Sequence, residues 1–188
     1  MKPMLMSLGV IALLLSACAD RTAIHTRAGD TSLNTVPNLS DLVGQSELIV
    51  TGTVTSSGDT WNIARGADPT TPSTTTVVLA QNFALAVDGV LKGAATPQIT
   101  WAVVQARGLV SAPLTFDADW MPPTIGGRYL LFLVRIPGTQ IYGIPAEPSR
   151  FRLAADARPE SKWKDASRYY PPAPIATLLE QVRAAARP

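Results

Sequence analysis

The segment that most constrains the fold is Phe83–Gly93, with the sequence FALAVDGVLKG. Large apolar side chains at Phe83, Leu85 and Val87 alternate with alanines, which is the period of a β-strand with one buried face. Asp88-Gly89 interrupts the alternation and predicts a bulge or kink before the apolar run resumes. Because a strand with a buried face needs neighbours, we expect the chain to build a sheet around this segment.

Other apolar segments predict the neighbouring strands and two helices. The expected strands are Glu47–Val54, Val77–Leu91, Ile99–Val104, Tyr129–Val134, Gln140–Ile144 and Phe151–Leu153. A short helix is expected to begin near Asn38 or Ser40, either of which can cap it. A final amphipathic helix is expected over Ile175–Ala186, with its apolar stripe docked on the sheet. The sequence therefore predicts a mainly β fold, a small closed barrel of five to six antiparallel strands with a helix at each end.

The first residues resemble a bacterial lipoprotein signal. One lysine precedes an apolar run of about 12 residues, whereas a membrane span needs about 20. Leu15, Ser16, Ala17 and Cys18 then match all four positions of the lipobox. The resemblance implies removal of residues 1–17, a thioether from Cys18 to diacylglycerol and acylation of the new amine. An ordinary secretory signal that happens to contain a cysteine is the alternative.

The lipobox also predicts where the protein is held. In lipoproteins of enteric-type bacteria, an aspartate directly after the lipidated cysteine retains the protein in the inner membrane, and that position is Ala19 here. An exported, lipid-anchored protein on the periplasmic face of the outer membrane is therefore expected if the organism is Gram-negative. Residues 18–37 are polar and aperiodic, and we expect a flexible tether that contains His25, followed by a single domain over residues 38–188.

Two long connections carry the candidate binding residues. Residues 56–76 are rich in Ser, Thr, Gly and Pro, and residues 107–127 form the second connection. Connections of about 20 residues in compact domains are usually functional or disordered. Large apolar side chains within them are candidate partner anchors, although such side chains often fold back onto their own domain. These candidates are Trp61, Phe116, Trp120 and Met121.

The residues offer no recognisable catalytic or metal site. The only histidine lies in the expected tether and the only cysteine is the expected lipid site, which excludes Ser-His-Asp and thiol chemistry from the folded domain. Asp117 and Asp119 have the spacing of some calcium loops, but the further carboxylate that such a loop needs is missing. Glu147 and the adjacent Ser161-Lys162 are the remaining candidates for acid-base chemistry. We expect no enzyme activity, no metal and no cofactor.

Composition excludes two further classes. Charged residues make up 16% of the chain and the formal net charge is +2, which matches neither a nucleic-acid-binding protein nor a disordered chain. Once the signal is removed, about 170 residues remain, enough for one domain with a sizeable core.

A family resemblance covers residues 39–153. Ser46–Val54, Val90-Leu91-Lys92-Gly93 and Gly127–Leu133 follow one another as three motifs. They resemble the netrin-like and tissue-inhibitor-of-metalloproteinases type of OB-fold barrel, where a V-x-G-x-V strand, an LKG strand end and a YLL strand occur in this order. The chain is similar also to uncharacterised bacterial proteins of that layout. The resemblance implies a barrel that contacts proteins through the connection after its first strand, residues 56–76 here.

The inhibitor mechanism does not carry over with the fold. Those inhibitors use disulfides and a free N-terminal cysteine that chelates the protease zinc, whereas this chain has one cysteine, Cys18, expected to be acylated. The leading hypothesis is therefore a non-catalytic lipoprotein that binds a protein or an envelope component. A structural spacer without a ligand, a protease-inhibitor-like module and a hydrolase using carboxylates or a Ser-Lys pair are the alternatives.

Overall fold

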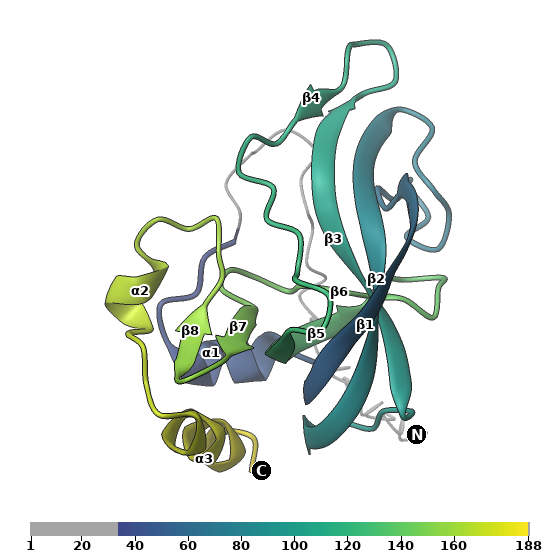
Figure 1. Cartoon of the computed structure of the whole chain (residues 1–188). Coiled ribbons are helices and arrows are strands. Elements are labelled where there is room, and N and C mark those ends of the chain that lie inside the picture. Colours follow the sequence, from purple (N-terminus) through teal and green to yellow (C-terminus); the bar gives the residue numbers. More distant parts are fainter. Residues whose placement is uncertain (1–33, 188) are drawn as a thin grey trace, which may run out of the picture. The chain divides into compact units, whose positions relative to one another are not determined.

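The computed structural model describes residues 34–187, which form a mainly β domain with a sheet of eight strands and three helices (Figure 1). The expected signal peptide, the lipobox Leu15, Ser16, Ala17 and Cys18, and His25 all lie outside the described residues. The strands are β1 (Leu48–Asn62), β2 (Thr76–Lys92), β3 (Gln98–Leu109), β4 (Thr115–Phe116), β5 (Arg128–Arg135), β6 (Tyr142–Gly143), β7 (Arg150–Leu153) and β8 (Ala157–Pro159). The helices are α1 (Leu39–Gln45), α2 (Ala166–Tyr169) and α3 (Ile175–Ala185).

Strand β1 is paired on both edges. It runs antiparallel to β2 on one side and, from Leu48 to Thr53, antiparallel to β5 on the other. β2 pairs with β3, β3 with β6, and β6 with β5, while β7 and β8 extend the sheet beyond β5 and β4 pairs with β3. The β3–β6 contact is parallel and consists of one residue pair, Trp101 and Tyr142. The prediction of only antiparallel pairs was therefore wrong at this contact.

Strands β1 and β3 extend further than their apolar patterns indicated. β1 continues past Val54 to Asn62, where Trp61 pairs with Ala80 of β2. Residues 55–60 of this extension are exposed, so their side chains carry no apolar alternation. Because β1 continues to Asn62 and β2 begins at Thr76, the connection between them is residues 63–75 and the predicted 56–76 loop was too long.

The predicted bulge lies at Asp88. Thr51 pairs with Gly89 and the next residue, Gly52, pairs with Val87, so Asp88 is the extra residue on β2. Opposite the bulge the backbones approach closely, because a Cβ added at Gly52 would lie 2.4 Å from the carbonyl oxygen of Ala86. Only glycine fits there without movement of the backbone.

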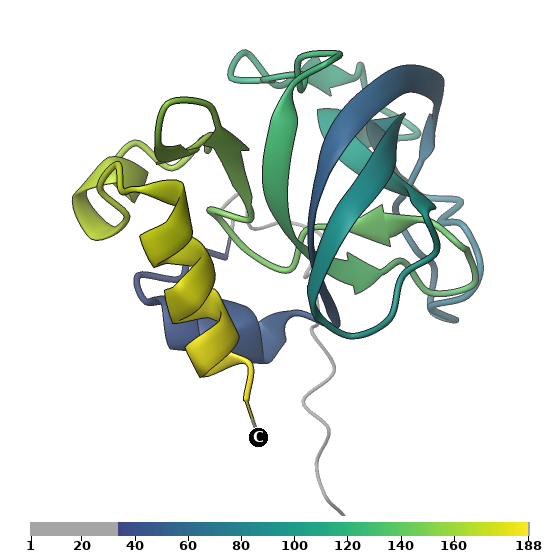
Figure 2. The ribbon, with the colours of Figure 1, turned by 60° about the horizontal axis from the view of Figure 1, so that its bottom comes forward.

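Strand β5 separates two hydrophobic cores. Leu130 and Phe132 face the core under the helices, while Tyr129, Leu131 and Leu133 face the core among the paired strands. Burial on both faces explains why this strand is a continuous apolar run rather than an alternating one. Figure 2 shows α1 and α3 packed side by side against the first core.

The ends of the domain are as well packed as its centre. Asn38, one of the two predicted caps, caps α1 by accepting a 2.8 Å hydrogen bond from the amide of Asp41. Leu178 and Val182 of α3 are buried, which confirms that this helix docks on the domain. Val36 is also buried and its amide donates to the carbonyl of Glu147 at 2.9 Å, so the folded domain begins before residue 38 and the predicted 18–37 tether is too long at its end.

Replacing Gly52 by alanine tests the close approach of β1 and β2. The added Cβ has no space beside the Ala86 carbonyl, so we expect a loss of about 1–3 kcal/mol in the free energy of unfolding, measured by urea denaturation. Gly44, exposed in α1 with no heavy atom within 4 Å of an added Cβ, is the matched control. Gly44→Ala should leave stability unchanged or raise it by about 0.5–1 kcal/mol, and equal effects of the two substitutions would refute the close approach.

Candidate functional site

The hairpin of β3 and β4 projects at the top of the view in Figure 1. Its end, residues 108–116, is called here the hairpin tip. Phe116 pairs with Ala106 across the hairpin, and the turn is closed by a 3.0 Å hydrogen bond from the amide of Ala112 to the carbonyl of Leu109. The amide of Val110 donates to the carbonyl of Thr75 at 3.1 Å, so the tip lies beside the end of the β1–β2 connection. The two connections that the sequence singled out are therefore neighbours.

The hairpin tip is apolar and exposed. Phe116 is 71% exposed, Val110 60%, Leu109 53% and Leu114 37%, and no residue from 108 to 116 is charged. These are four of the eight large apolar side chains that are exposed among residues 34–187. Such a concentration on one projection is a feature of surfaces that meet another molecule.

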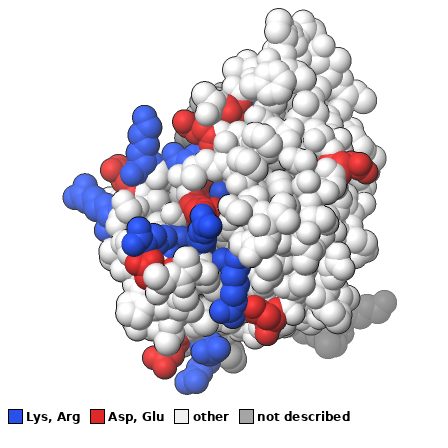
Figure 3. Space-filling model, in the orientation of Figure 1, with Lys and Arg blue, Asp and Glu red and all other residues white. Residues whose placement is uncertain are grey.

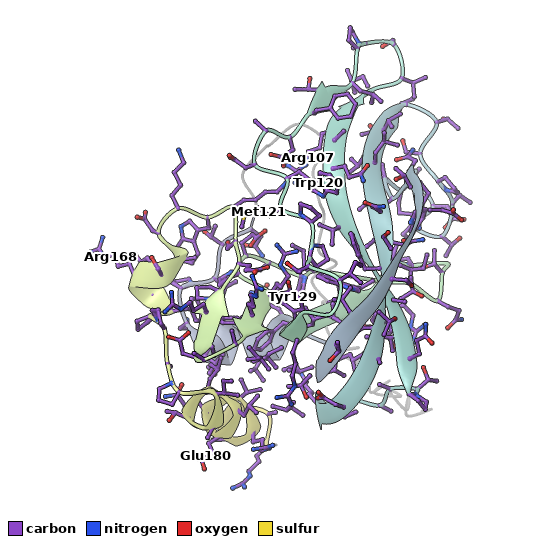
Figure 4. All side chains as sticks on the ribbon, in the orientation of Figure 1. Arg107, Trp120, Met121, Tyr129, Arg168 and Glu180 are labelled. Carbon is purple, nitrogen blue, oxygen red and sulfur yellow. The ribbon has the colours of Figure 1, made fainter. Side chains whose placement is uncertain are left out.

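The other aromatic candidates contact their own domain. Trp61 is half-buried and donates from Nε1 to Asn82 Oδ1 at 2.7 Å. The centroid of its ring lies 5.1 Å from the guanidinium carbon of Arg65. Trp120 is half-buried and its Nε1 is buried without a hydrogen-bond partner, while Met121 beside it is 41% exposed (Figure 4). A role in partner binding stays a prediction for all four candidates, and Phe116 has by far the most free surface.

Residues 117–121, called here the crossing segment, run from the hairpin tip back toward β5 and are held by charged groups of the C-terminal part. Asp117 forms an ion pair with Lys162, and the guanidinium of Arg150 donates from Nη2 to the carbonyl of Met121 at 2.8 Å. Arg150 is 7% exposed, and its Nε lies 3.1 Å from Glu160 Oε2. The base of the tip is thus fixed to the domain through side chains 29 to 45 residues away in the sequence.

The same cluster contains the remaining acid-base candidates. Ser161 Oγ donates to Glu147 Oε2 at 2.6 Å and accepts from the amide of Trp163 at 3.0 Å. Asp119 is exposed and contributes only its amide, which donates to Asp117 Oδ1. The structure therefore brings Asp117, Glu147, Ser161 and Lys162 together, which spacing in the sequence did not indicate.

Burial and neighbouring charges shift the pKa values of two carboxyl groups of the cluster in opposite directions. Glu147 is 6% exposed, and desolvation raises its pKa above the usual value. The hydrogen bond from Ser161 and the charges of Arg150 and Lys162 lower this pKa, but desolvation outweighs them. Desolvation also opposes ionisation of Asp117, but the hydrogen bonds from Lys162 and the Asp119 amide outweigh it and lower the pKa of Asp117. A hollow of about 360 Å³ borders the cluster, with Trp120 and Lys162 among its lining residues.

Two polar groups of the cluster that line this hollow already have partners. The ammonium of Lys162 is neutralised by Asp117, and the hydroxyl of Ser161 is engaged by Glu147. Among residues 34–187, no group of three or more His, Cys, Asp or Glu side chains is arranged to hold a metal ion. These contacts are explained if the cluster serves to hold the crossing segment to the rest of the domain.

The raised pKa of Glu147 predicts that Glu147→Gln increases the stability of the fold by an amount that depends on pH. The folded chain keeps the Glu147 proton to a higher pH than the unfolded chain does, so wild-type stability falls as pH rises from the unfolded pKa, near 4.5, through the folded one. Glutamine retains an oxygen acceptor for Ser161 and has no proton to lose. Urea unfolding from pH 3.5 to 7.5 should show that the free energy of unfolding of the variant increases relative to that of wild type as pH rises. Glu180→Gln, at an exposed site on α3, should show no such trend. Parallel pH profiles for Glu147→Gln and wild type would show that this carboxyl is not desolvated.

The sequence matches no protein-family model, and no curated protein was found to be similar to it. No helix among residues 34–187 is long and apolar enough to span a membrane. The lipobox and the netrin-like resemblance therefore stay predictions, and function has to be argued from the surface of the domain.

Proposed function

We propose that this chain is an exported lipoprotein, anchored through Cys18, whose domain binds a component of the cell envelope through the hairpin tip. The observation that carries the proposal is the 71% exposure of Phe116 beside three other exposed apolar side chains. Keeping these groups in water is unfavourable, and burial against a partner would remove that cost. The alternative of a spacer without a ligand agrees with the inward contacts of Trp61 and Trp120, but it does not explain why an apolar projection is exposed to water.

A small closed barrel of the OB type is the scaffold that we propose for this function. Its support is the order of pairing, in which β1, β2, β3, β6 and β5 each pair with the next and β5 pairs with β1. All five strands also contribute side chains to one core, among them Val50, Leu85, Trp101, Leu131 and Tyr142. The single residue pair between β3 and β6 fits an OB barrel, which is partly open.

The proposed role is non-catalytic. The serine, lysine and carboxylates that come together near the crossing segment contact one another, and holding that segment to the domain accounts for these contacts. The inhibitor-like alternative needs a free N-terminal cysteine, which acylation of Cys18 would remove.

Site-specific photo-cross-linking in growing cells tests the binding surface. A benzophenone side chain in place of Phe116 should form covalent adducts with whatever molecule covers the tip, whether that molecule is a protein or a lipid. Val90, which is 47% exposed on β2, is the matched control position because it is apolar but remote from the tip in the sheet register. Adducts at position 116 and few at position 90 are expected, and equal or absent adducts would remove the tip as a binding surface.

A further inference from the structure

Resting on the proposed function, we further propose that the hairpin tip inserts into the lipid bilayer that holds the Cys18 anchor, with its apolar side chains at the boundary between headgroups and acyl chains. The bilayer is then the envelope component that the tip binds.

The shape and composition of the tip favour a bilayer as the occupant. Leu109 and Val110 lie at the end of β3 and in the turn, and Leu114 and Phe116 lie on the returning side, so apolar side chains surround a convex end. A protein partner would need a pocket formed around this projection, whereas a fluid bilayer conforms to it. The apolar faces of interfacial helices enter membranes to a depth of about 5–10 Å, and we expect a similar depth for the tip.

Most of the sheet that carries the tip is uncharged, and the charged residues that border the tip, Arg107 and Asp117, lie at its base. Residues 69–87 and 93–106, which include most of β2 and β3, contain no Asp, Glu, Lys or Arg. In Figure 3 the upper part of the face is almost free of charged side chains, and most of them gather at the lower left. Moving a charge toward hydrocarbon is costly, so the uncharged tip can enter the boundary layer only as far as its base, where Arg107 and Asp117 would lie among the headgroups.

The backbone of the tip limits the depth of insertion. Hydrogen bonds from the amides of Ala112 and Val110 satisfy two groups of the turn. Ser111 and Thr115 add hydroxyls among the apolar side chains. Backbone groups without protein partners need water or headgroups, which exist at the boundary and are absent from the hydrocarbon core. The tip is therefore suited to the boundary layer.

The length of chain before the domain allows this orientation. Fifteen residues separate Cys18 from Asn34, where the described domain begins. Fully extended, they span about 55 Å, so the anchor does not hold the tip away from the membrane surface. The acyl chains would keep the tip at high effective concentration near the bilayer, and weak insertion would then suffice to orient the domain.

A fluorescent reporter in the turn tests insertion. In the mature lipoprotein the thiol of Cys18 is bound to lipid, so Ser111→Cys provides a single free thiol for an NBD fluorophore while Phe116 stays in place. The labelled protein is reconstituted into phosphatidylethanolamine–phosphatidylglycerol vesicles that contain lipids spin-labelled near the top of the acyl chain. We expect a blue-shifted emission with quenching severalfold stronger than for the same fluorophore at Ser57→Cys, an exposed position on β1.

Variants of the apolar side chains complete the test. In the Ser111→Cys protein, Phe116→Ala and Leu109→Asp should each reduce the quenching severalfold, while Val90→Ala should leave it unchanged. Equal thermal unfolding of the variants would show that the fold is intact, as expected for exposed positions.

Fluorophore emission at position 111 that is typical of an aqueous environment would overturn the proposed insertion. If position 116 still cross-links a protein in cells, binding through the tip stands without insertion, and if it cross-links nothing, both proposals fall.

Discussion

The structure depends on the pairing of β1 along both of its edges. Between Ile49 and Thr53 this strand is paired with β2 and with β5 at once, and glycine at position 52 permits the close approach of β1 and β2 there. Side chains of β1 enter both cores, because Ile49 faces the helices and Val50 faces the paired strands. Loss of this pairing would leave the β2–β3 layer joined to β5 only through the two-residue strand β6.

Beyond Thr53, β1 leaves β5 and continues only with β2, and the β3–β4 hairpin extends in the same sheet. The hairpin tip is therefore an outgrowth of a rigid sheet, not a free loop. The crossing segment fixes its base a second time through the contacts of Asp117 with Lys162 and of Met121 with Arg150. An apolar surface supported in this way loses little conformational entropy when it meets a partner.

Periodicity predicted the strands wherever one face is buried, and it failed where that condition ends. Val77–Leu91 was predicted within a residue of β2 at each end, but the extension of β1 past Val54 is polar on both faces and gave no signal. The buried cluster was missed for another reason, because the ion pair of Asp117 and Lys162 joins residues 45 apart and only the fold brings them together. Aromatic content marked residues 107–127, yet it did not distinguish the inward Trp120 from the outward Phe116, since large side chains serve burial and binding alike.

We propose above all that the domain works at a membrane to which Cys18 fixes it, because the proposed binding surface and its proposed insertion both depend on that location. The most direct test is the intact mass of the protein from the membrane fraction, compared with that of Cys18→Ala. A chain that begins at Cys18 and carries added acyl chains, both lost in the variant, is the predicted result. An unmodified chain recovered in soluble form would contradict the claim and leave Cys18 as a free thiol.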